Sequence, residues 1–273
     1  SGVLNLIPNA GVHIATRAQC APNVFRTSFT NAQPTLALGK AMVEKGHKKA
    51  VWITWSYAAG DEAFEGFEQS YKAAGGEIVK KLALPFPNVE FQALLTEIAS
   101  IKPDAVACFF AGGGAAKFLR DYHAAGLSKS IPLYGSGFLT EGVLDAAGDA
   151  ANGVLTTLHY SDSLDTPRNK QFRLEYAKAF KLQPDVYAVQ GYDTGLLLIK
   201  GANAVKGDIN NKQALYAAMR GAEIDSPRGK WKMSPAHNPI QDMYLRRVEN
   251  KENKVIGIAA KAVADPATGC RMA

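Results

Sequence analysis

Short apolar runs alternate with longer amphipathic stretches along much of the chain. Residues 48–55 (KKAVWITW) are β-branched and aromatic and predict a buried strand, and residues 58–76 place apolar and small positions at helical spacing before a Gly-Gly stop. Three such pairs and a final strand are predicted, at 48–55 and 58–76, 77–85 and 88–103, 104–114 and 115–127, and 131–138. Strands that alternate with helices of this length form βαβ units, so residues 48–138 predict a doubly wound α/β lobe with a parallel sheet.

The second half of the chain is richer in helices. The predicted elements are a strand at 153–160, helices at 166–181, 186–205 and 211–222, and an edge strand at 242–250. The segment 1–31 supplies one predicted strand, VLNLIP, so a lobe made from it and from the later helices is expected to lack its first strands. The predicted domains are a partial lobe one at 1–31 and 158–238, lobe two at 32–157 and 239–260, and a C-terminal tail at 261–273.

Composition narrows the classes of partner. The chain has 273 residues, 47% hydrophobic and 21% charged, with a formal net charge of +6. The basic residues occur as pairs, such as Lys48-Lys49 and Arg246-Arg247, and not as a stripe with interleaved aromatics, which argues against a nucleic-acid partner. No apolar run approaches the roughly 20 residues of a membrane span. The start, SGVLNLIPNAG, has no signal-peptide pattern, so no leader is expected within this chain.

The motifs weighed for chemistry do not form a catalytic site. AGGGA at 111–115 lacks the GxGxxG spacing of a dinucleotide fingerprint, and YGSGF at 134–138 reads Gly-Ser-Gly and not GxSxG. The five histidines are scattered without metal-ligand spacing. The sequence therefore predicts no catalytic residues, no metal and no cofactor.

Aromatic residues occur where the predicted strands end. Tyr57 follows the first strand, Phe109 and Phe110 precede the glycine loop, and Phe138 follows the fourth strand. Ligands of open α/β sheets bind outside the carboxyl ends of the strands. Together with the glycine loop, this cluster favours a binding crevice for an apolar or aromatic solute.

The three cysteines are far apart in sequence. Cys108 lies in the apolar run AVACFF and is predicted to be a buried free thiol. Cys20 and Cys270 lie in polar stretches near the two ends and can pair if the protein is exported, because a disulfide persists only in an oxidising compartment. The spacing alone leaves this pairing open.

The sequence resembles the periplasmic leucine/isoleucine/valine-binding family of ABC-transporter receptors, and within it the branch that takes aromatic carboxylates. The resemblance is carried, in order, by LNLIPNAG, NVFRTSFTNAQ, KKAVWITWSYAAGDEAFEGF, EFQALLTEIASIKPDAV, FLRDYHAAG, IPLYGSGF, AAGDAANGVLT, YAVQGYDTG, SPRGKWKM and HNPIQDMYLR. It implies two α/β lobes with a ligand cleft between them, hinge closure on the ligand, and a membrane permease as partner. It also implies a monomer that is periplasmic, or extracellular and membrane-tethered.

The resemblance departs at the front. Family chains carry roughly 100 further residues before the segment that matches LNLIPNAG, including a serine-containing ligand loop. The expectation is that this chain is a fragment, or that the missing piece lies outside the numbering.

The resemblance also implies ligand-binding residues. The matching positions are Asn9, Ala10 and Gly11 in lobe one, Tyr57 and Ala59, Phe110, Ala111 and Gly112, and Ser136, Gly137 and Phe138 in lobe two, and Tyr187 with Gln190 on a lobe-one helix. Amino-acid-binding members hold the ligand ammonium with an acidic residue at the position of Gly137 and place a tyrosine near Ala59. Both are lost here. A buried unpaired ammonium costs several kcal/mol, so we expect a carboxylate with an aromatic body.

Three functional alternatives remain beside this prediction. They are a branched-chain or other amino-acid receptor, the ligand-sensing module of a signalling system, and, least favoured, a doubly wound enzyme. For an exported receptor we further predict that Cys20 and Cys270 form a disulfide that ties the C-terminal tail to the first lobe.

Overall fold

The computed structural model describes residues 2–272, which divide into two compact units. Unit 1 contains residues 1–30, 164–242 and 261–273, and unit 2 contains residues 31–163 and 243–260. Relative to the predicted boundaries, residues 31 and 158–163 lie in unit 2, and residues 239–242 and the predicted tail 261–273 lie in unit 1.

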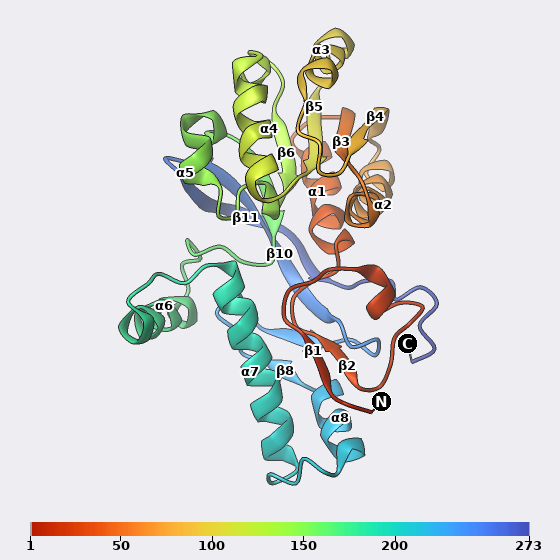
Figure 1. Ribbon diagram of the computed structural model, residues 1–273, viewed down its shortest axis with the longest axis vertical. Coiled ribbons are helices and arrows are strands. Elements are labelled where there is room, and N and C mark those ends of the chain that lie inside the picture. The colour runs from red at the N-terminus through yellow and green to blue at the C-terminus, as the bar shows by residue number, and fades with distance from the viewer. Residues whose placement is uncertain (1, 273) are drawn as a thin grey trace. The chain divides into compact units, whose positions relative to one another are not determined.

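Unit 2 is built on a mostly parallel sheet (Figure 1). Its strands are β3 (Lys49–Ser56), β4 (Glu77–Pro85), β5 (Ala105–Phe109), β6 (Leu133–Ser136), β7 (Leu155–Leu158), β10 (Pro239–Glu249) and β11 (Glu252–Val263). They lie in the order β4-β3-β5-β6-β7-β10, with β11 paired to β10. Strands β4 to β7 are parallel, and β10 runs antiparallel to β7. The predicted α/β class is confirmed.

Helices cover both faces of this sheet. They are α1 (Ala32–Glu44), α2 (Ala58–Ala73), α3 (Gln92–Ile101), α4 (Gly112–Ala124), α5 (Leu144–Ala147) and the 3₁₀ turns η2 (Leu127–Lys129), η3 (Gly137–Leu139) and η4 (Gly148–Ala151). On one face, Trp52 of β3 stacks on Phe67 of α2 with ring centroids 5.0 Å apart. On the other, Val51 and Ile53 join the apolar core that includes α3 and α4. The six central residues of β3 are all buried, as expected for a parallel strand covered on both faces.

The prediction that residues 242–250 form an edge strand is wrong. Its polar ends and alternating pattern predicted an edge strand, but β10 is flanked by β7 and β11. The polar end leads into a tight turn at Asn250 and Lys251, both with positive φ. The alternation also contains Arg246, which is fully buried and hydrogen-bonded. β10 is therefore an interior strand, and one of its charged side chains, Arg246, lies on a covered face.

Unit 1 combines short strands with three helices. Its elements are β1 (Asn5–Ile7), η1 (His13–Ala15), β2 (Val24–Arg26), α6 (Pro167–Phe180), α7 (Val186–Ala204), α8 (Lys212–Arg220), β8 (Glu223–Ile224), β9 (Trp231–Met233) and the start of β10. Each of the three α-helices begins at a side-chain cap: Thr166, Asp185 and Asn211 accept hydrogen bonds from the first turns. The core includes Phe25 and Trp231.

The amino-terminal segment contains two strands and not the single one predicted. β1 and β2 pair in parallel as a two-stranded sheet, with Asn5 opposite Val24 and Ile7 opposite Arg26. β2 has only three residues and is followed by the polar run Thr27-Ser28, so it carried no alternation long enough to detect.

The carboxyl-terminal segment is fastened to unit 1 by several contacts. A disulfide joins Cys20 to Cys270, whose Cα atoms are 5.5 Å apart, and this is the pair proposed from the sequence. The Arg17 guanidinium forms two hydrogen bonds to the Asp265 carboxylate at 3.0 and 2.9 Å, and the Thr30 hydroxyl donates to the same carboxylate at 2.8 Å. Burial alone would raise the pKa of Asp265. The hydrogen bonds from Arg17, from the Ala267 N–H and from Thr30, with the charge of Arg17, outweigh burial and hold this pKa below its ordinary value. Cys108 is a buried free thiol.

Candidate ligand-binding surfaces

Eight of the predicted site residues meet at one end of the unit 2 sheet. They follow the carboxyl ends of β3, β5 and β6, which are neighbours in the sheet. They are Tyr57 and Ala59 after β3, Phe110, Ala111 and Gly112 after β5, and Ser136, Gly137 and Phe138 at the end of β6. We call this set the unit 2 strand-end surface.

Two helices begin at this surface. Tyr57 is the N-cap of α2 and Ala111 is the N-cap of α4, and neither side chain forms a capping hydrogen bond within the described chain. The first N–H groups of a helix have no partner within the helix, and they favour negative charge. The start of each helix can therefore donate backbone hydrogen bonds to an anionic group.

The aromatic residues at the strand ends differ in exposure. Tyr57 is half-buried, and burial raises its pKa above the ordinary value. Phe138 is nearly buried, with 7% of its surface exposed. Phe110 is completely buried and packs on Trp55 and Phe118 at centroid distances of 4.9 and 4.6 Å. The Phe110 side chain belongs to the core, and its backbone lies at the strand end.

The glycine loop has a packing role. A Cβ atom at Gly114 would lie 2.4 Å from Cζ2 of Trp55, so only glycine lets the first turn of α4 lie against the indole. Trp55 in turn donates from Nε1 to the carbonyl oxygen of Asn88 at 2.7 Å. The AGGG run thus fixes an indole beside the strand ends.

Gly137 is also enclosed. A Cβ atom there would lie 2.5 Å from Cβ of Leu158 and 2.7 Å from Nη2 of Arg246. Arg246 is fully buried, donates to the Gly137 carbonyl at 3.1 Å and forms an ion pair with Glu141. This strand-end loop has no room for an acidic side chain at position 137, and the nearby carboxylate of Glu141 is paired with an arginine.

Unit 1 brings together a second set of predicted residues. The Asn9 amide donates from Nδ2 to Oε1 of Gln190 at 2.7 Å, which joins the loop after β1 to helix α7. Gln190 is buried, and Tyr187, one turn earlier on α7, is 46% exposed. Ala10 is exposed and Gly11 is buried. We call Asn9, Ala10, Gly11, Tyr187 and Gln190 the unit 1 surface.

The orientation of the loop after β1 is fixed by its carbonyl groups. Ser28 donates to the Asn9 carbonyl at 3.0 Å, and the buried Arg26 donates to the carbonyls of Ala10, at 2.9 Å, and Val12. In a planar trans peptide the C=O of one residue and the N–H of the next point in opposite directions. The N–H groups of Ala10 and Gly11 therefore point away from Ser28 and Arg26.

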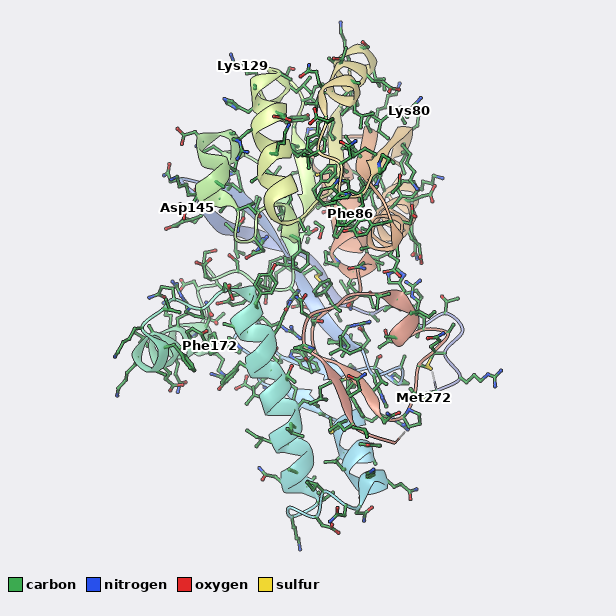
Figure 2. The ribbon with its side chains drawn as sticks, in the orientation of Figure 1. Lys80, Phe86, Lys129, Asp145, Phe172 and Met272 are labelled. Carbon is green, nitrogen blue, oxygen red and sulfur yellow. A yellow bond between two sulfur atoms is a disulfide. The ribbon has the colours of Figure 1, made fainter. Side chains whose placement is uncertain are left out.

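Sequence reasoning missed several residues that shape these surfaces. Arg246 looked like one member of a basic pair with Arg247, and Arg26 was read only as part of a family segment. Phe86, labelled in Figure 2, follows the carboxyl end of β4 and stacks on Tyr57. A signal was present for Phe86, because the rule that singled out the aromatics after the other strands applies equally to the phenylalanine after LALP.

Residues 2–272 contain neither a cluster of potential metal ligands nor a membrane-spanning helix. In this part of the chain no three His, Cys, Asp or Glu side chains are grouped as metal ligands would be. No helix in the same range is long and apolar enough to cross a bilayer.

Comparisons with known proteins agree on one family. The sequence profile of the periplasmic binding protein family matches residues 4–253. The chain is 33% identical over 239 residues to the Leu/Ile/Val-binding protein homolog 6 of Brucella abortus (strain 2308), which covers 85% of this chain and 61% of that relative. The chain thus spans about three fifths of the length of its curated relatives.

Two solved structures are similar over nearly the whole chain. One is an ABC-transporter solute-binding protein from R. palustris in complex with benzoate, with 53% identity, a TM-score of 0.92, and coverage of 99% of this chain and 74% of that one. The other is a solute-binding protein from Rhodopseudomonas palustris BisB5 in complex with 3,4-dihydroxybenzoic acid, with 34% identity, a TM-score of 0.86, and coverage of 97% and 74%.

Proposed function

This chain belongs to the family of periplasmic binding proteins, and from that premise we propose that it is part of the solute-binding component of an ABC uptake system for small aromatic carboxylates. The proposed mechanism is binding followed by closure of two lobes on the ligand. No catalytic step is assigned to it.

The observation that carries the proposal is the orientation of the loop after β1. Its carbonyl groups are held by Ser28 and Arg26, so the N–H groups of Ala10 and Gly11 point away from these partners. Backbone N–H groups presented in this way suit a carboxylate, and hydrogen bonds to an ionised acceptor are about twice as strong as neutral ones. Asn9 can contribute the second hydrogen of its amide nitrogen.

The unit 2 strand-end surface supports an aromatic body for the ligand. Tyr57 and Phe138 are the rings proposed to contact it, beside the backbone of Ala111 and Gly112 and the Ser136 hydroxyl. Aromatic pairs contribute about 0.5–1.5 kcal/mol beyond the burial of area. The similar R. palustris protein was solved with benzoate and the BisB5 protein with 3,4-dihydroxybenzoic acid, and both ligands combine a carboxyl group with a ring.

An amino-acid receptor is the second candidate, favoured by the 33% identity to the Leu/Ile/Val-binding protein homolog. It requires a partner for the ligand ammonium. Position 137 is glycine, with Leu158 and Arg246 where a side chain would lie, and the nearby Glu141 already pairs with Arg246. We therefore rank this candidate below the aromatic carboxylate.

Calorimetry on the ligand-free, full-length protein tests the proposal. We expect benzoate, 4-hydroxybenzoate or 3-phenylpropanoate to bind and leucine not to bind. Replacing the exposed Tyr187 by Ala should weaken binding while the unfolding transition stays unchanged. Tight leucine binding without a response to any aromatic acid would overturn the ligand class, and no binding of either kind would overturn the receptor.

The proposal extends to location and partners. A receptor of this family would act in the periplasm, or outside the cell on a membrane anchor, as a monomer that docks on a membrane permease. Fractionation of the native host, with co-purification of a permease, would test both points.

A further inference from the structure

Phe86 is a large apolar side chain that remains exposed beside the unit 2 strand-end surface. It follows β4, and 54% of its surface is accessible, whereas Phe91, Phe110 and Phe118 of the same unit are fully buried. The loop that carries it is fastened: the Asn88 N–H donates to the Pro85 carbonyl at 2.7 Å, and Trp55 donates to the Asn88 carbonyl at 2.7 Å. The exposure of Phe86 is thus imposed by a fixed loop.

The ring of Phe86 lies nearly parallel to that of Tyr57. Their centroids are 4.9 Å apart and their planes differ by 13°. Trp55 meets both rings edge-on, at 5.3 Å from Phe86 and 6.2 Å from Tyr57. Tyr57 therefore has Phe86 against one face and an indole beside it.

Trp55 is itself packed into the core. It is 4% exposed, its indole contacts the buried Phe110 ring at 4.9 Å, and Gly114 leaves space for it at the start of α4. Trp55 therefore contacts the core on one side and the stacked pair of Tyr57 and Phe86 on the other. Phe86 is the outermost member, so removing it would free one face of Tyr57 and leave the core intact.

We propose that Phe86 is a positioning residue, which holds the Tyr57 ring by stacking and thereby makes the binding surface selective for planar aromatic acids over saturated acids of similar shape. This inference rests on the proposed function. Offset and edge-on ring contacts depend on orientation, so a fixed Tyr57 ring favours an aromatic ligand specifically. A mobile Tyr57 would still exclude water from any apolar ligand, but it would lose that preference.

The experiment measures the affinities of the full-length protein for benzoate and for cyclohexanecarboxylate. The variants are F86A, F86L, F86Y, Y57A and the double variant F86A/Y57A, with F180A as the matched control because Phe180 is a similarly exposed phenylalanine, on α6. We expect F86A and F86L to weaken benzoate binding by about 2- to 12-fold, the range that one aromatic pair supplies. F86A and F86L should also reduce the ratio of benzoate affinity to cyclohexanecarboxylate affinity. F86Y keeps an aromatic ring, so it should leave both the benzoate affinity and this ratio at the wild-type value.

The double variant F86A/Y57A shows whether Phe86 acts by holding the Tyr57 ring or by shielding the ligand directly. If Phe86 acts through Tyr57, F86A should have no further effect in the Y57A background, and F180A should match the wild type throughout. An unchanged benzoate affinity in F86A, or the same loss with and without Tyr57, would overturn the inference while the proposed function stands. If the unmodified protein binds neither benzoate nor hydroxybenzoates, the proposed function fails, and this inference fails with it.

Discussion

The buried Arg26 side chain donates from Nε to the backbone carbonyl of Ala10 at 2.9 Å. The same guanidinium donates to the Val12 carbonyl, to the Thr16 hydroxyl at 2.6 Å and to the Asn238 side-chain oxygen at 3.0 Å. One side chain thus connects the loop after β1 to β2 and to the segment before β10. The geometry of the proposed carboxylate-binding loop depends on this arginine.

Replacing Arg26 by Lys should therefore weaken both folding and ligand binding. An ammonium has three hydrogens and no planar fork, so at least one of the four acceptors loses its donor. We expect a loss of about 2–3 kcal/mol in the free energy of unfolding, measured by urea titration, and at least a tenfold weaker carboxylate affinity by calorimetry. The half-exposed Arg247, changed to Lys, is the control and should alter neither. Unchanged affinity in R26K would mean that the loop does not hold the ligand.

A side chain at position 137 should destabilise unit 2 without creating an amino-acid receptor. The Cβ of G137A would lie 2.5 Å from Leu158 Cβ, and overpacking of this kind costs about 1–3 kcal/mol. G195A, in the middle of α7 with nothing within 4 Å of its Cβ, is the control, and it should be neutral or stabilising by roughly 0.5–1 kcal/mol. Thermal unfolding measures both. If G137D were stable and bound leucine, our account of the missing ammonium partner would be wrong.

The number of reactive thiols should depend on whether the protein is folded and whether it is reduced. Burial raises the pKa of the Cys108 thiol well above its ordinary value, and Cys20 and Cys270 are joined to each other. The native protein should show no thiol reactive with a maleimide, the unfolded protein one, and the unfolded and reduced protein three. The C20S/C270S variant should lose about 2–5 kcal/mol of stability, because the bridge closes a loop with a sequence separation of 250 residues. Fast labelling of two thiols in the native protein would contradict the bridge.

The sequence predicted β3 to β6 and the helices α2, α3 and α4 between them, because the helical stretches were long and strongly periodic. It could not distinguish Phe109 from Phe110. Both faces of a parallel sheet are buried, so the apolar run ACFF does not reveal which ring turns into the core between α3 and α4. In the structure the Phe110 ring packs there, against Trp55 and Phe118.

Arg246 and Arg247 illustrate the other limit. Successive residues of a strand point to opposite faces, and the structure buries Arg246 while Arg247 stays exposed. One neighbour that makes β10 interior, β7, is distant in sequence, and the other, β11, follows β10 after a tight turn but was not predicted. Without that pairing, the basic pair was indistinguishable from a solvated edge.

His237 should make the stability of unit 1 dependent on pH. Its Nδ1 lies 2.9 Å from the Val24 carbonyl, which can only accept, so Nδ1 carries the hydrogen. Arg220 donates from Nε to Nε2 at 3.0 Å, so Nε2 must be unprotonated, and the ring is neutral. The imidazole is fully buried and stacks on Phe25 with centroids 3.9 Å apart. Burial first, and Arg220 in addition, lower the pKa of His237 below its ordinary value of 6.5, against the Val24 hydrogen bond.

A histidine whose pKa is lowered by folding binds its proton more readily in the unfolded chain. Its contribution to stability is therefore complete above about pH 6.5 and is lost as the pH falls through the lower pKa of the folded state. His237 has a φ of 62°, which asparagine tolerates, so H237N removes the titrating group with little backbone strain. Between pH 7.5 and 5, the free energy of unfolding from urea titrations should fall more steeply for the wild type than for H237N. H123N, at an exposed position, should follow the wild-type curve. Parallel curves for the wild type and H237N would mean that His237 does not sense pH in this range.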